Sequence, residues 1–161
     1  MPTHYPVPKP EAVQDVLGAM VGTDVKVVIE KHPDIDADAP AILAEFVSDQ
    51  EDVGAICLVD HRAAISLGGA LVGVPPDVVQ QAIEGYKLDD EAIENVREVV
   101  NVMAQLFNSE YTPHVRFRDL HRQPGKLPED TSELRRNPLA SRAFKVSIDK
   151  YATGILSFML A

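Results

Sequence analysis

Five polar side chains share one face of a predicted helix near the middle of the chain. They fall at i, i+4, i+7, i+11 and i+14, and they are Glu94, Glu98, Asn101, Gln105 and Asn108. The opposite face is apolar, and the polar face contains no lysine, although a solvated helix face usually contains some. Carboxamide groups orient water and hydrogen-bond anions without carrying charge. We therefore interpret this face, called the polar stripe below, as a candidate working surface.

An acidic segment has oxygen ligands at the spacing of a calcium loop. Asp34, Asp36 and Asp38 occupy positions one, three and five, and Glu45 occupies position twelve. Position six, where a calcium loop needs glycine, is Ala39, and a predicted strand precedes the segment in place of a helix. The prediction is an acidic surface loop that does not bind calcium tightly.

The glycines and the cysteine have structural interpretations. Gly68, Gly69 and Gly73 come inside a predicted helix, some eight residues after the preceding strand, whereas a dinucleotide loop has its glycines directly at the strand end. Close packing of the helix is the prediction. Cys57 is the single cysteine and lies in an apolar run, so we expect it to be a buried small hydrophobic residue.

Histidine and arginine residues give no metal or catalytic motif. The five histidines lack metal-ligand spacing, and the pair Asp60 and His61 at a strand end has no recognisable nucleophile, so we interpret the pair as structural. Three arginines alternate with other residues over one strand and could bind an anion, but their alternation predicts one solvated strand face: Arg116, Arg118 and Arg122.

Hydrophobic periodicity predicts the elements that would hold these residues. Helices are predicted over 11–20, 61–73 and 89–108, with a short helix or turn over 77–86 and with Asp89 or Asp90 capping the helix that carries the polar stripe. Strands are predicted over 24–31, 41–47, 53–60, 112–120, 142–149 and 153–160, and a loop over 123–138. The strand over 53–60 is apolar almost throughout, so we expect it to be central and buried on both faces.

The two halves of the chain repeat the same order of elements. Residues 11–60 and 89–160 each predict a helix, a strand, an irregular segment and a two-strand hairpin, and 61–88 joins them. This order indicates an internal duplication within a single domain over 11–161. Residues 1–10 are rich in proline and predict an extended segment.

Composition narrows the class of protein. A length of 161 residues and 45% apolar content favour one domain with a real core. There is no apolar run of about 18 residues and no secretory signal, and one cysteine allows no internal disulfide, which together predict a cytoplasmic protein. A net charge of −10 argues against nucleic acid as a partner. Residues 1–110 contain six basic and 20 acidic residues (net −14), whereas residues 111–161 contain nine and five (net +4). This charge asymmetry could steer a protein partner or mark two faces of one domain.

With these elements in place, the chain resembles the CheC/CheX/FliY family of chemotaxis proteins. That family is built from two helix–β–x–β–β repeats, and its phosphatase signature runs Asp/Ser-x-x-x-Glu-x-x-Asn on an exposed helix. The matching positions are Glu94, Glu98 and Asn101, and Pro113 lies where the family opens the next strand with a proline. The resemblance covers most of 11–161 and implies an α+β fold, with a mainly antiparallel six-stranded sheet packed with two long helices.

Three positions depart from the family pattern. Glu94 replaces the family's Asp or Ser, and Gln105 stands where a small glycine is common, so that its bulk could obstruct a close-docking partner. In the first helix the equivalent stretch, residues 15–18, reads Asp-Val-Leu-Gly and lacks a Glu-x-x-Asn signature. One signature in place of two resembles CheX more than CheC.

The resemblance implies a phosphatase that acts on the phospho-aspartate of a response-regulator receiver domain. Asn101 would hold a water in line with the phosphorus, and Glu98 would pair with the partner's lysine. Glu94 and Gln105 would contribute to partner binding. The partner would supply Mg²⁺, so the chain itself would need no metal or cofactor.

Two other functions stay open at this point. One is a non-catalytic interaction module of the same fold, in signalling or motility. The other is a small-ligand or calcium-binding domain that uses the acidic segment. Neither a nucleic acid nor a membrane is an expected partner, and the sequence leaves monomer and homodimer open.

Overall fold

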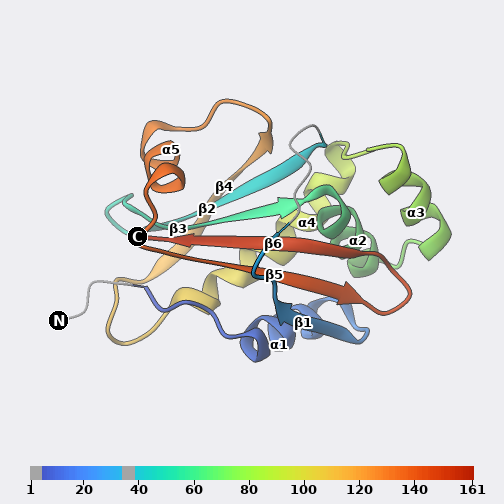
Figure 1. Ribbon diagram of the computed structural model, residues 1–161, viewed down its shortest axis with the longest axis horizontal. Coiled ribbons are helices and arrows are strands. Elements are labelled where there is room, and N and C mark those ends of the chain that lie inside the picture. The colour runs from blue at the N-terminus through green and yellow to red at the C-terminus, as the bar shows by residue number, and fades with distance from the viewer. Residues whose placement is uncertain (1–4, 34–38) are drawn as a thin grey trace.

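Six antiparallel strands form one sheet, and the apolar strand over 53–60 lies at its centre (Figure 1). The computed structural model describes residues 5–33 and 39–161. The strand order is β1-β5-β6-β3-β2-β4. The strands are β1 (Val25–Ile29), β2 (Ala41–Ser48), β3 (Val53–Asp60), β4 (Val115–Gln123), β5 (Ala140–Ile148) and β6 (Thr153–Leu160).

Helices cover the two faces of the sheet unequally. The larger core contains side chains from α1, α2 and α4 packed on one face, whereas α5 packs on the other face against β3 and β6 (Figure 1). The helices are α1 (Pro10–Val21), α2 (His61–Val72), α3 (Pro76–Glu84), α4 (Asp90–Met103), the short 3-10 helix η1 (Ala104–Phe107) and α5 (Glu129–Arg136). None of the described helices is long and apolar enough to cross a membrane.

The two halves of the chain are related in the sheet as well as in sequence. The first half runs α1-β1-β2-β3 and the second runs α4-β4-α5-β5-β6. The strands β1, β2 and β3 of the first half correspond to β4, β5 and β6 of the second half. When each strand is replaced by its counterpart, the strand order is the same read from the opposite edge of the sheet. The predicted α+β fold with a repeated unit and a six-stranded antiparallel sheet is therefore confirmed.

Burial is nearly complete along two interior strands of the sheet, β3 at its centre and β2 between β3 and the edge strand β4. All eight residues of β2 are buried, as are seven of the eight residues of β3, because helices cover both faces at this point. The prediction of a central strand over 53–60 is confirmed. Cys57 is fully buried within it, and burial raises the pKa of its thiol, which makes it an inert core residue.

Four phenylalanines fix the end of α4 on the sheet. Phe107 of η1 lies with its ring 5.1 Å from that of Phe46 and 5.5 Å from that of Phe158, and Phe144 lies 5.7 Å from Phe158. All four side chains are fully buried. Burying one such ring contributes about 2 kcal/mol, so this cluster orients the apolar face of α4 inward.

Glycines allow α2 to pack closely against its neighbours. A Cβ on Gly68 would lie 3.1 Å from the Cβ of Asn95, and a Cβ on Gly69 would lie 2.6 Å from Cγ2 of Val79. Gly73 ends the helix with a φ of 75°, a conformation that favours glycine. The prediction of close helix packing is confirmed for Gly68 and Gly69, whereas Gly73 caps the helix and a Cβ there would meet no heavy atom within 4 Å.

Helix α5 corrects the predicted loop over 123–138. Its eight residues are mostly charged and bury only Thr131 and Leu134, so they show little apolar periodicity. Leu134 and Thr131 hold the helix on the sheet, and the order of its charges complements the helix dipole. Acidic residues occupy its first turn and basic residues its last turn: Glu129, Asp130, Arg135 and Arg136.

Candidate functional site

Helix α4 carries the candidate site, and local sequence explains why it forms. The side chain of Asp89 caps its start, with Oδ1 accepting a 2.9 Å hydrogen bond from the backbone N–H of Ala92. Asp90 and Glu91 add negative charge to the first turn, which the helix dipole favours. Five apolar residues are buried on the inner face: Ile93, Val96, Val99, Val100 and Met103.

Glu98 and Asn101 lie exposed on the outer face of α4, one turn apart. On a helix this spacing brings the two Cβ atoms within roughly 6 Å of each other. Gln105 is exposed one turn further on. The side chains of these three residues make no hydrogen bond or ion pair with residues 5–33 or 39–161. A carboxylate and a carboxamide therefore stand side by side without competing partners in the described part of the chain.

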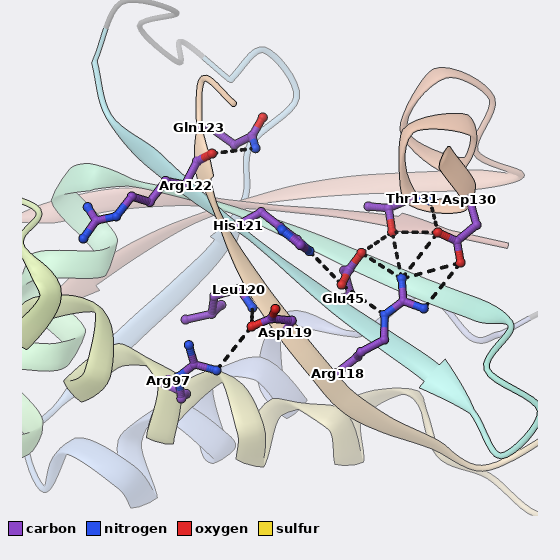
Figure 2. A network of polar contacts seen from close by, with 10 residues as sticks. All are labelled: Glu45, Arg97, Arg118, Asp119, Leu120, His121, Arg122, Gln123, Asp130 and Thr131. Atoms are coloured by element: carbon purple, nitrogen blue, oxygen red, sulfur yellow. Dashed lines mark hydrogen bonds and ion pairs between the residues drawn. The ribbon is translucent and has the colours of Figure 1, made fainter. Parts of the chain in front are cut away.

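Glu94 also lies on the outer face but is paired. Its Oε1 lies 3.4 Å from Nε of Arg97. Nη1 of Arg97 in turn lies 3.5 Å from Oδ1 of Asp119 on β4 (Figure 2). The guanidinium of Arg97 also lies over the Phe117 ring, 5.7 Å from its centre. Arg97 thus ties the start of the polar stripe to β4 and partly neutralises the charge of Glu94.

Asn108 does not belong to the polar stripe, which corrects the sequence prediction. Its Oδ1 accepts a 2.8 Å hydrogen bond from the N–H of Val115, and its Nδ2 donates to the carbonyl of Val115 at 3.1 Å. The predicted helix over 89–108 ends as α-helix at Met103, and the following 3-10 turn has a different period. Asn108 itself has extended backbone, so its side chain turns toward β4 and holds the start of that strand.

A buried carboxylate in β2, that of Glu45, holds together a network of polar contacts that the sequence did not predict. Glu45 is 1% exposed, and its Oε1 and Oε2 accept hydrogen bonds from Nε and Nη2 of Arg118 at 3.1 and 2.9 Å (Figure 2). Nε2 of His121 lies 2.8 Å from Oε1, and the hydroxyl of Thr131 donates to Oε2. Asp130 pairs with the same Arg118 at 3.4 Å.

This network determines the charge state of Glu45. Burial alone raises the pKa of Glu45, but the hydrogen bonds from Arg118, Thr131 and His121 outweigh burial and hold the pKa below its usual value. In return, the carboxylate of Glu45 raises the pKa of Arg118. The only sequence signal was one glutamate within the apolar run of β2, whose partners are at least 73 residues away.

The three arginines of β4 correct a second prediction, because they do not form one solvated face. Arg116 pairs with Glu51, and Arg122 donates to the carbonyl of Leu88 and to Oδ1 of Asp90, both at 2.5 Å. A β-bulge lies between them. Glu45 is opposite Asp119 and Phe46 is opposite Phe117, so Arg118 is the extra residue of the bulge.

Two neighbouring residues at the bulge contact elements on opposite faces of the sheet, as successive strand residues do. Arg118 reaches Glu45 and α5, whereas Asp119 reaches Arg97 on α4 (Figure 2). Ion pairing therefore occupies all three arginines of β4, and the strand connects α4 to the buried network.

The remaining candidates are structural or lie outside the described residues. Asp60 caps α2 through a 2.8 Å hydrogen bond from the N–H of Ala63, and burial raises the pKa of its carboxyl. The ring of His61 stacks 5.1 Å from that of Tyr86. Within 5–33 and 39–161, no group of three or more His, Cys, Asp or Glu residues could hold a metal ion. The predicted acidic loop lies at the segment 34–38, outside the described residues, whereas Glu45 is occupied by Arg118.

Comparison with solved structures identifies the fold. FliY of Thermotoga maritima matches with a TM-score of 0.60 and 11% identity, over 92% of this chain and 82% of that chain. A chain of the FliM–SpeE complex of H. pylori matches with a TM-score of 0.66 and 6% identity, over 94% of this chain and 80% of that chain. A chain of the CheX–CheY–BeF3–Mg²⁺ complex of Borrelia burgdorferi matches with a TM-score of 0.55 and 12% identity, over 93% of both chains.

Sequence comparison adds no relative. No model of a protein family matches the chain, and no curated protein matches it in sequence. At identities of 6–12%, the structural likeness establishes the fold. This chain has the CheC-like fold that FliY, CheX and the FliM middle domain share.

Proposed function

We propose that this protein is a phosphatase for the phospho-aspartate of a response-regulator receiver domain. The observation that supports it is the pair Glu98 and Asn101, exposed one turn apart on α4 without partners in the described part of the chain. A structural role for this pair would require side-chain contacts that neither residue makes with residues 5–33 or 39–161. Both residue types suit a site that orients water and binds a cation of a partner.

The chemistry requires little from the phosphatase itself. Asn101 enters the active site of the receiver domain, and its carbonyl oxygen accepts a hydrogen bond from a water in line with the phosphorus. The water oxygen forms a bond to phosphorus while the bond to the aspartyl oxygen breaks, and the carboxylate leaves with the electron pair. Glu98 pairs with a lysine of the receiver domain and fixes the docking register. The receiver domain supplies Mg²⁺.

The CheX neighbour supports this choice of partner. Its structure contains CheY, BeF3 and Mg²⁺, and it shares the fold over 93% of this chain. On this basis we propose a cytoplasmic setting in chemotaxis or a related two-component pathway. The paired Glu94 and the exposed Gln105 would contribute to docking beside the catalytic pair.

A second candidate function is a non-catalytic module that binds a signalling or motility protein. It is favoured by the single signature, since α1 carries an exposed Asp15, a buried Leu17 and Gly18 at the equivalent turn. FliM structures of the same fold contain SpeE and FliG. The homodimer that the sequence leaves open would be compatible with either function.

One experiment separates the two candidates. Purified protein is incubated with a receiver domain labelled at its phospho-aspartate, and release of inorganic phosphate is followed over time with Mg²⁺ present. Faster release than from the receiver domain alone supports the phosphatase. Binding without faster release excludes catalysis and leaves the interaction module.

A further inference from the structure

A cleft lies between α2, α3 and the first turns of α4. Its volume is about 220 Å³. The floor is apolar: Ile65, Val74, Val78, Val79 and Ala82 line it. The polar side chains that line the cleft belong to the start of α4 and to the segment that leads into it, and they include Glu91 and Asn95.

The walls of the cleft are held in place by the fold. Gly69 in α2 brings α3 close, since a Cβ at this position would lie 2.6 Å from Cγ2 of Val79. The loop wall at Val74 is fixed by its carbonyl, which accepts a 2.6 Å hydrogen bond from the hydroxyl of Tyr151. Val79 is buried, whereas Val78 is 47% exposed at the rim. The cleft is therefore preformed, with one apolar edge facing solvent.

The surface around the cleft is strongly acidic. Residues 76–98, which form α3 and most of α4, contain seven acidic and two basic residues, a net charge of −5 and half of the charge of the whole chain. One of the two bases, Lys87, pairs with Asp89 at 3.9 Å, and the other, Arg97, pairs with Glu94. Anionic ligands, nucleic acids and acidic lipid surfaces would be repelled here.

The cleft and the proposed catalytic pair lie along the same helix, α4. Glu91 lines the cleft, and Glu94, Glu98 and Asn101 follow it at i+3, i+7 and i+10 along exposed positions of α4. A partner that places a phosphoryl group at Asn101 therefore extends over the cleft if it follows the helix toward its start. A volume near 220 Å³ is below the ~300–1,000 Å³ of small-molecule sites and suits a single apolar side chain.

We infer that this cleft is a docking subsite for the receiver domain, which takes one apolar side chain flanked by lysine or arginine. The inference rests on the proposed function, because it assigns the occupant to the same partner. The apolar floor receives the side chain, and the acidic rim at Glu91 attracts its basic neighbours. The subsite contributes affinity and selects among receiver domains, whereas the catalytic step stays at Asn101.

Two matched pairs of variants test the subsite. Val78→Ser removes the exposed apolar edge, and Val72→Ser is its control, since Val72 is 55% exposed but does not line the cleft. Glu91→Lys reverses charge at the rim, and Glu11→Lys is its control, because both residues lie in the first turn of a helix. Each protein is titrated by calorimetry with a receiver domain activated by beryllofluoride and Mg²⁺, and its thermal unfolding is measured in parallel.

We expect Val78→Ser and Glu91→Lys to raise Kd about fivefold or more, while kcat at saturating receiver domain stays within twofold of wild type. The effect of Glu91→Lys should shrink at high salt. Controls should bind as wild type does. Equal Kd for the cleft variants and their controls would overturn the inference, as would a wild-type protein that binds no receiver domain. Tight binding that depends on the cleft without phosphate release would instead overturn the proposed catalysis alone.

Discussion

Nη2 of Arg118 lies 2.9 Å from Oε2 of Glu45, and this pair joins the extra residue of a β-bulge to a carboxylate that is 1% exposed. Arg118→Ala should therefore lower the free energy of unfolding by about 3 kcal/mol, because it leaves a buried carboxylate without its main cation. Urea unfolding followed by circular dichroism measures this. Arg116→Ala is the matched control on the same strand, where an exposed pair with Glu51 should contribute less than about 1 kcal/mol. Equal losses would show that burial of Glu45 is unimportant.

The lowered pKa of Glu45 predicts a specific dependence of stability on pH. An unperturbed glutamate titrates near 4.5, so above that pH the carboxylate is ionised in both states and its contribution is complete. As pH falls below 4.5 toward the folded pKa, the unfolded chain binds the proton first and the contribution is lost. Stability should thus rise with pH in this window, and Glu45→Gln should flatten the slope in urea titrations from about pH 3 to about pH 6. Asp60, whose pKa is raised, makes stability fall as pH rises, but it is present in both the wild type and the Glu45→Gln variant. An unchanged slope would contradict the prediction.

Asn101→Ala should abolish water positioning and reduce phosphate release at least a hundredfold, an order-of-magnitude value for lost orientation. Glu98→Ala should mainly weaken docking and raise KM. Because both side chains are exposed and outside caps and core, neither change should alter the free energy of unfolding by more than about 0.5 kcal/mol. Single-turnover kinetics with a phosphorylated receiver domain provide the measurement. Strong destabilisation by either change would assign the pair a structural role.

Asn108→Ala should show the reverse pattern and serves as the control for Asn101→Ala. It removes two hydrogen bonds to the backbone of Val115, so we expect a loss of about 1–3 kcal/mol in the free energy of unfolding. Activity per folded molecule should remain within a few-fold of wild type. Thermal and urea unfolding check the first expectation, and kinetics below the melting temperature check the second. Loss of activity with full stability would return Asn108 to the polar stripe.

Much of the fold was predictable because most elements bury a regular face. The strand over 53–60 and the helix around Val96 and Val100 have apolar residues at the spacing that burial requires, and both formed as predicted. Helix α5 was not predicted because it buries only Thr131 and Leu134, so too few apolar residues mark it in the sequence.

The candidate site was predictable only in part, for a related reason. The helical period correctly predicted that Glu98 and Asn101 are exposed, because the face of a helix on which a residue lies follows from local spacing in the sequence. The change to a 3-10 turn after Met103 and the bulge at Arg118 depend on contacts with distant strands, and a single sequence does not reveal them. The pairings of Arg97 with Asp119 and of Glu45 with Arg118 were missed for that reason.

The strand order has a consequence for how the chain can assemble. Among the described strands, β1 pairs with β5 alone and β4 with β2 alone, so the first strand of each half completes the hairpin of the other half. Neither half can form its own three-stranded sheet in this arrangement. The two halves exchange their first strands. Folding must therefore bring both halves together before either edge of the sheet can form. Helix α4, which begins the second half, packs against α1 and α2, so the geometry of Glu98 and Asn101 also depends on residues outside that half.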